Sequence, residues 1–195
     1  MRGNDLACAA AFAAWVVFAV AFAVRKRAPA ASSRRRAPAA IIGMIFQAAA
    51  VALIWSVRRV PLGAPIVPAR PTLSAVAAAA AIAAAWGSVW LMLWAIKTLG
   101  RQWAVEARLV DDHQLITNGP YAFVRNPVYV GFFGLSIATG VVVTTPMALI
   151  ASIALFIAGT IVRVRVEERL LRGAFGPAFD RYAERVPALL PRLVK

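Results

Sequence analysis

Five apolar runs constrain most strongly what this chain can fold into. They extend over residues 6–24, 39–57, 72–96, 128–143 and 147–162. Runs of this kind are typical of helices that cross a hydrocarbon core about 30 Å thick, although the last two are short for a complete span. With 62% hydrophobic and only 15% charged residues, the chain lies outside the usual range of soluble proteins. We therefore predict an all-α integral membrane protein with about five transmembrane helices.

Basic residues are distributed unequally between the segments that connect these runs. Of the 22 Lys and Arg residues, 18 lie in segments 25–38, 97–127 and 163–195, and 4 lie in segments 1–5, 58–71 and 144–146. The positive-inside rule then predicts an outside N-terminus and a cytosolic C-terminus. The same rule explains the Arg25–Arg27 and Arg34–Arg36 clusters better than a nucleic-acid partner does. A cleaved signal peptide is disfavoured for the first run, because its charged cluster follows the run.

Several common kinds of site are excluded by the sequence. The single cysteine, Cys8, lies in an apolar run, and no spacing typical of metal ligands is present, so we predict no metal. No G-x-G-x-x-G segment follows a predicted strand, so a Rossmann-type nucleotide site is not expected. The lack of charged residues within the spans also disfavours an ion or proton pathway.

The longest polar interruption runs from His113 to Tyr129 and holds the only histidine of the chain. Gly119-Pro120 predicts a turn. Pro127 disfavours helical geometry at Asn126, so we predict Asn126 as the N-cap and Pro127 as the first residue of the next helix. The unpaired N–H groups of that helix N-terminus could receive an anion.

Two sequence blocks resemble those of one enzyme family. The first has the pattern H-x-L-[IV]-x-x-G-P-Y-x-x-x-R-x-P-x-Y over residues 113–129, and the second has E-E-x-x-L-x-x-x-F-G-x-x-[FY]-x-x-Y over residues 167–182, followed by Arg185-Val186-Pro187. In this order they resemble the isoprenylcysteine carboxyl methyltransferase family of integral membrane enzymes. The resemblance covers roughly residues 103–191. Asn126 departs from the histidine that many eukaryotic members have there, and bacterial relatives often carry asparagine.

The resemblance implies a methyltransferase that uses S-adenosyl-L-methionine, in a bacterial inner membrane. Its acceptor would be lipid-like or hydrophobic and would be methylated at a carboxylate. The first part of the chain, 1–96, would hold three membrane helices. The second part, 97–195, would be the methyltransferase core, with a cytosolic loop, a helical hairpin and a cytosolic helical tail that form the cofactor site.

Matching the blocks residue by residue gives the expected site. Arg163 would face the acceptor and act with Glu167 in catalysis. The expected cofactor-binding residues are Glu106, His113, Gln114, Leu115, Ile116, Tyr121, Arg125, Asn126, Pro127, Val128, Tyr129, Glu167 and Glu168. The residues themselves add that Arg163 and Glu167 share one helical face, with the base before the acid. Glu168 has the favourable order with Arg172, which favours a surface ion pair for Glu168.

Two alternatives remain open at this stage. If the acceptor is an amine, the chain is an N-methyltransferase of phospholipid head groups, and Glu167 or His113 is the candidate base. The alternative of another class is a non-catalytic small membrane transporter or assembly protein on the same scaffold.

Overall fold

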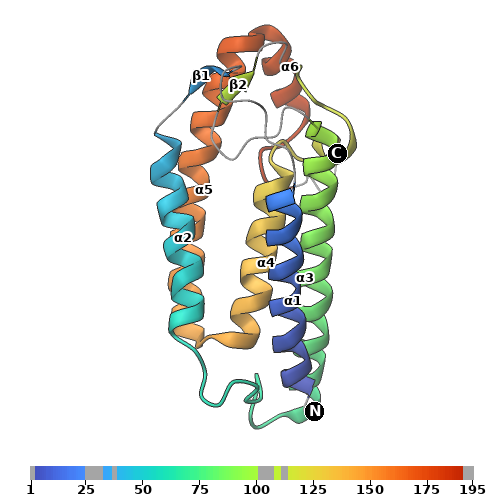
Figure 1. The fold of residues 1–195 in the computed structure, drawn as a ribbon, viewed down its shortest axis with the longest axis vertical. Coiled ribbons are helices and arrows are strands. Elements are labelled where there is room, and N and C mark those ends of the chain that lie inside the picture. The colour runs from blue at the N-terminus through green and yellow to red at the C-terminus, as the bar shows by residue number, and fades with distance from the viewer. Residues whose placement is uncertain (1–2, 25–32, 37–38, 101–107, 111–113, 191–195) are drawn as a thin grey trace.

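The computed structural model describes residues 3–24, 33–36, 39–100, 108–110 and 114–190. Most of these residues are helical, and the helices form an elongated bundle (Figure 1). In chain order the elements are α1 (Gly3–Val24), β1 (Ser33–Arg36), α2 (Ala40–Ser56), α3 (Pro71–Leu99), β2 (Arg108–Val110), the 3-10 helix η3 (Gly119–Ala122), α4 (Pro127–Val143), α5 (Pro146–Phe175) and α6 (Pro177–Arg185).

Each predicted apolar run is a helix with nearly the predicted bounds. Among the described residues, α1, α3 and α5 are long and apolar enough to cross a membrane, and α2 and α4 are shorter apolar helices of 17 residues each. The prediction of membrane helices is confirmed, and the count of five spans stays a prediction. The last run is not short as a helix, because α5 continues past residue 162 to Phe175.

Proline sets where four of these helices begin. Pro71, Pro127, Pro146 and Pro177 each occupy the first turn of a helix, where the missing N–H costs no hydrogen bond. Asn126 is the N-cap residue of α4, as predicted, but its side chain makes no capping hydrogen bond. Gly176, with φ of 49°, makes the sharp turn between α5 and α6.

Helix packing separates two neighbours in the sequence. Residues 144–145 join α4 to α5, but α5 packs mainly along α2, and α4 packs mainly along α3 (Figure 1). The two helices of the predicted hairpin, α4 and α5, are therefore joined by a short turn but do not pack closely along each other. Glycine explains the close packing of α3 and α4, because a Cβ at Gly131 would lie 2.5 Å from Met92 Cγ and one at Gly134 would lie 2.4 Å from Ser88 Oγ.

A small two-stranded sheet adds to the helical fold that the sequence predicted. Strands β1 and β2 pair antiparallel, with Ser33 opposite Val110 and Arg36 opposite Arg108. The sheet joins the segment between α1 and α2 to the segment after α3. The apolar part of the fold remains helical, with a buried core shared by α1, α3 and α4 that includes Ala14, Ala85, Val89, Met92, Leu135 and Ala138.

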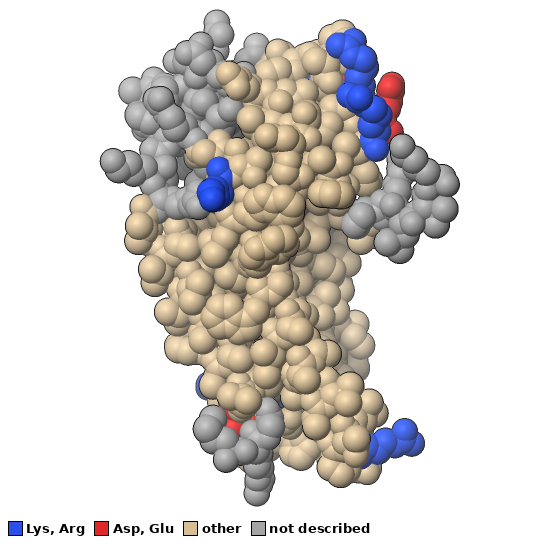
Figure 2. Space-filling view, turned by 90° about the vertical axis from the view of Figure 1, so that its right-hand side faces the viewer, with Lys and Arg blue, Asp and Glu red and all other residues tan. Residues whose placement is uncertain are grey.

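The connecting segments gather at opposite ends of the bundle. One end holds β1, β2 and α6, and the other holds the start of α1, the segment between α2 and α3, and the turn between α4 and α5 (Figure 1). On the face shown in Figure 2, charged residues lie near the two ends and an uncharged belt lies between them. Hydrogen bonds join the described residues of the two sequence blocks, so both blocks lie at the same end, as the sequence predicted.

Candidate active site

The polar segment before α4, residues 114–126, packs against α6. Gly119, with φ of 57°, begins η3 and places Tyr121 in a buried position. The Tyr182 hydroxyl of α6 donates a hydrogen bond to the Tyr121 carbonyl at 2.7 Å. Burial raises the pKa of the Tyr182 phenol to about 12 and also raises the pKa of the Tyr121 phenol. Both phenols are therefore protonated at neutral pH, and Tyr182 is a donor.

Arg125 connects three parts of this end of the molecule. Its guanidinium contacts Glu168 of α5 through Nε at 2.9 Å and Nη2 at 2.8 Å. Its Nη1 donates to the Ala183 carbonyl at 2.9 Å and to the Val186 carbonyl. Ionised donors make hydrogen bonds roughly twice as strong as neutral ones. Arg125 thus fastens the loop to α5, α6 and the tail.

The tail after α6 is also held by the backbone before α4. The N–H of Arg125 donates to the Pro187 carbonyl at 2.9 Å, and the N–H of Asn126 donates to the Ala188 carbonyl at 3.1 Å. The Asn126 side-chain amide donates to the same Ala188 carbonyl at 3.1 Å. Asn126 therefore tethers the tail in this structure, in place of capping α4.

Three side chains from α4 and α5 form a compact polar cluster, which we call the Arg–Glu–Tyr cluster (Arg163, Glu167, Tyr129). Arg163 Nη2 lies 3.2 Å from Glu167 Oε1, and the Tyr129 hydroxyl donates to the same oxygen. Arg163 Cζ lies 5.1 Å from the centre of the Tyr129 ring, within the range of a cation–π contact. The side chains of Arg163 and Glu167 are 10% and 24% exposed. The side chain of Glu167 is thus more exposed than that of Arg163.

The two adjacent glutamates have different partners. Glu167 belongs to the Arg–Glu–Tyr cluster, and Glu168 pairs with Arg125. The predicted surface pair of Glu168 with Arg172 is wrong, because Arg172 pairs with Asp180 at 2.8 Å in an exposed position. The sequence could not show this, since the partner of Glu168 lies 43 residues away in the chain.

The remaining predicted site residues are placed as follows. Glu106 and His113 lie outside the described residues. Gln114 is exposed, Leu115 and Ile116 are half-buried, and all three lie just before η3. At the start of α4, Pro127 is buried and Val128 is half-buried. The structure therefore brings Tyr129, Arg163 and Glu167 together, and joins Arg125 to Glu168.

Sequence reasoning missed the part of the site that is made of backbone. The carbonyls of Ala183, Val186 and Ala188 accept the hydrogen bonds from Arg125 and Asn126. Carbonyl acceptors leave no signal in residue type, so only the nearby Arg185-Val186-Pro187 segment of the resemblance pointed to this region. Among the described residues, no group of three or more His, Cys, Asp and Glu residues could hold a metal ion.

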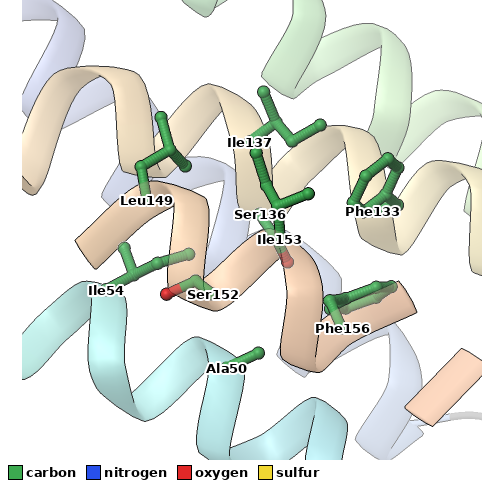
Figure 3. A pocket seen from close by; sticks show the side chains of 9 residues that line it. All are labelled: Ala50, Ile54, Phe133, Ser136, Ile137, Leu149, Ser152, Ile153 and Phe156. Carbon is green, nitrogen blue, oxygen red and sulfur yellow. The ribbon is translucent and has the colours of Figure 1, made fainter. Parts of the chain in front are cut away.

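An apolar gap lies deeper in the bundle, between α2, α4 and α5 (Figure 3). Phe133 is one helical turn after Tyr129 on α4, and Phe156 lies before Arg163 on α5, so both helices of the Arg–Glu–Tyr cluster also contribute to the gap. Its lining consists of Ala50, Ile54, Phe133, Ser136, Ile137, Leu149, Ser152, Ile153 and Phe156.

The fold and the site together define an integral membrane protein with a polar site at one end of a helical bundle. Comparison with known proteins then gives a family that the chain resembles. Residues 80–173 match the model of the isoprenylcysteine carboxyl methyltransferase (ICMT) family, so this part of the chain is similar to that family. The resemblance predicted from the two sequence blocks is confirmed.

The named relatives include isoprenylcysteine O-methyltransferases and metal-resistance proteins. Protein-S-isoprenylcysteine O-methyltransferase B of Arabidopsis thaliana is 34% identical over 99 residues, which are 50% of this chain and 50% of that protein. The cobalt-zinc-cadmium resistance protein CzcN of Cupriavidus metallidurans is 36% identical over 104 residues, which are 51% of this chain and 46% of that protein. The chain thus spans about half the length of the curated relatives that it matches.

A solved structure has a similar fold. The eukaryotic intramembrane Ras methyltransferase ICMT matches with a TM-score of 0.56 and 24% sequence identity. The match covers 80% of this chain and 53% of that chain. The fold similarity therefore extends beyond the residues that match the family model.

Proposed function

We propose that the protein is a membrane methyltransferase that uses S-adenosyl-L-methionine to methylate a carboxylate of a lipid-like acceptor, as the name of the isoprenylcysteine family suggests. The observation that carries the proposal is the Arg–Glu–Tyr cluster. It places a largely buried guanidinium beside a carboxylate, near the start of α4 and in the second half of α5. The match of residues 80–173 to the family model supports the same reaction class.

The donor set of this region fits the proposed cofactor. S-adenosyl-L-methionine supplies an electrophilic methyl group on a sulfonium. A carboxylate can hold its ribose hydroxyls or its amino group, and an aromatic ring attracts a nearby cation. Glu167 and Tyr129 provide these groups, and the Glu167 side chain is 24% exposed. We propose that the cofactor is bound by Glu106, His113, Gln114, Leu115, Ile116, Tyr121, Arg125, Asn126, Pro127, Val128, Tyr129, Glu167 and Glu168.

Arg163 would orient the acceptor. A guanidinium presents a planar fork of N–H donors that matches the two oxygens of a carboxylate. A carboxylate is already ionised at neutral pH, so it needs alignment and exclusion of water more than a general base.

Localisation and organisation follow from the same proposal. The bundle with its apolar belt would lie in a bacterial inner membrane, with the N-terminus outside and the site at the cytosolic end. Residues 1–96 would be a membrane part, and residues 97–195 would be the methyltransferase core. The family model begins at residue 80, within α3, so this helix is shared by the two parts.

Two measurements on the purified protein test the proposal. The first is calorimetric binding of S-adenosylhomocysteine, which a transporter or an assembly protein has no reason to bind. The second is methyl transfer to an S-farnesylated cysteine with an acetylated amine and a free carboxylate. We expect binding and transfer. Binding without transfer would reject this acceptor class and favour an amine acceptor, and lack of binding would reject the methyltransferase.

A further inference from the structure

Helix α2 lies outside the residues that match the family model, yet it meets α5 beside Arg163. The two helices contact each other through glycine. A Cβ at Gly43 would lie 2.6 Å from the Gly159 carbonyl oxygen, and a Cβ at Gly159 would lie 2.6 Å from the Gly43 carbonyl oxygen. On the next turn, Gln47 Nε2 donates to Thr160 Oγ1 at 2.9 Å. Small residues allow this close approach of membrane helices, and the polar pair adds to it.

Gly43 also contacts the side chain of Arg163. A Cβ at Gly43 would lie 2.5 Å from Arg163 Cγ and 3.3 Å from Arg163 N. Carbon atoms in contact prefer a separation of about 3.5–4.0 Å, so a methyl group here would displace the Arg163 stem by about 1 Å. At its other end, Arg163 lies over Tyr129 of α4. The Arg163 side chain therefore lies between the backbone of Gly43 in α2 and the ring of Tyr129 in α4.

We propose that Gly43 is a positioning residue, which sets the place of the Arg163 guanidinium at the acceptor site. This inference rests on the proposed function, since it gives α2 a role in acceptor binding. The absence of a side chain at residue 43 lets the arginine stem lie against α2, and its guanidinium then reaches Glu167. Gly43 acts only through Arg163, so cofactor binding does not depend on it.

The test compares two alanine substitutions at the same helix crossing. Gly43→Ala obstructs both the Gly159 backbone and the Arg163 stem. Gly159→Ala is the matched control, because its Cβ would meet the Gly43 carbonyl oxygen, Phe46 and Gln47 of α2, with Arg163 absent from those contacts. Both substitutions add an atom between the same helices, but Arg163 is among the three nearest neighbours only of the Cβ at residue 43.

Steady-state methyl transfer to the acetylated S-farnesylcysteine is measured at saturating cofactor. Displacement of a binding group by 1 Å can cost on the order of 10²-fold in rate. We expect Gly43→Ala to raise the acceptor KM at least tenfold and to leave S-adenosylhomocysteine affinity within about twofold. Gly159→Ala should raise the KM by much less, at a similar loss of thermal stability. Equal KM changes in the two variants would overturn the inference.

A second measurement does not depend on the acceptor. Arg163→Ala removes the Cγ atom that a methyl group at residue 43 would meet. We expect the loss of melting temperature caused by Gly43→Ala to be smaller in the Arg163→Ala background, and the loss caused by Gly159→Ala to be the same in both backgrounds. Equal losses from Gly43→Ala in both would overturn the inference even if the wild type proves inactive toward the probe.

A third measurement applies if the Gly43→Ala variant does not fold. If Gly43→Ala yields no folded protein, the double variant Gly43→Ala/Arg163→Ala is purified in its place. Recovery of folded protein would support the contact between residue 43 and the arginine stem. Arg163→Ala alone is the control, because it leaves Glu167 without its ion-pair partner. Failure of the double variant where Arg163→Ala folds would show that the Gly159 backbone accounts for the defect, and the positioning role would be rejected.

Discussion

Glu167 and Glu168 are adjacent in the chain but serve different contacts, because successive residues of a helix point about 100° apart. Glu167 faces Tyr129 and Arg163, where the proposed cofactor and acceptor would meet. Glu168 faces Arg125, which fastens α6 and the tail. A substitution at either residue removes one negative charge. Any difference between the two substitutions is therefore due to the position of the glutamate and not to the change of net charge.

Glutamine substitutions at the two positions should therefore give opposite patterns. We expect Glu167→Gln to weaken S-adenosylhomocysteine binding at least tenfold, which is about 1.4 kcal/mol. Glu168→Gln should weaken binding less and lower thermal stability more, because it weakens a partly buried charged contact worth about 1.5–3 kcal/mol. Calorimetry and thermal unfolding in detergent measure the two effects. The reverse order of binding losses would refute the assignment of Glu167 to the cofactor.

Arg163 separates the possible acceptors. For a carboxylate acceptor, Arg163→Gln should abolish most methyl transfer and leave cofactor affinity nearly intact. Arg163→Lys should recover only part of the activity, since an ammonium lacks the planar fork. The measurement is transfer of labelled methyl into a lipid extract at saturating cofactor. Unchanged or increased transfer in Arg163→Gln would contradict a carboxylate acceptor and favour an amine, which a guanidinium would repel.

At the scale of elements, α6 depends on the buried hydroxyl of Tyr182. Tyr182→Phe leaves the Tyr121 carbonyl without this donor, so we expect a loss of about 1 kcal/mol of stability near pH 7. The folded pKa of about 12 exceeds the unfolded value of about 10, so this phenol stabilises the fold below pH 10 and loses that contribution as the pH rises toward 12. The stability deficit of Tyr182→Phe should therefore shrink between pH 10 and pH 12. A deficit that stays constant over this range would show that Tyr182 does not act through its protonated hydroxyl.

Helix positions were predictable because they depend on local signals. Hydropathy located the apolar runs, and Asn126-Pro127 marked the start of α4. Helix partners were not predictable. Membrane helices are apolar all round, so hydropathy does not show which face meets which neighbour. The pairing of α5 with α2 depends on the fit of Gly43 and Gly159, which no periodicity reveals.

The candidate site was predictable to the extent that it is local. The pairing of Arg163 with Glu167 follows from a spacing of four residues on one helix. The contacts of Tyr129 with Glu167 and of Arg125 with Glu168 join residues 38 and 43 positions apart. Those contacts depend on the angle between α4 and α5, which is a property of the packed bundle. The two-stranded sheet was missed for the same reason, because its strands are short and distant in sequence.

At the scale of the whole molecule, the unequal charge at the two ends of the bundle determines the expected topology. The predicted inner segments carry 18 of the 22 basic residues. In a Cys8→Ala background, cysteine at Ala178 should resist an impermeant thiol reagent in intact cells and react after lysis. Cysteine at Val60, which is 92% exposed at the opposite end, is the matched control and should react in intact cells. Labelling of the Ala178 position without lysis would overturn the topology.

The central claim is that a carboxylate of a lipid-like molecule receives the methyl group. The most direct measurement incubates membranes that contain the protein with methyl-labelled S-adenosylmethionine, treats the lipid extract with mild base, and collects volatile methanol. A carboxyl methyl ester releases its label under these conditions, and a methylated amine does not. We predict that most protein-dependent label becomes volatile and that Arg163→Gln abolishes it. Label that is stable to base, or no protein-dependent label in the lipid extract, would contradict the claim.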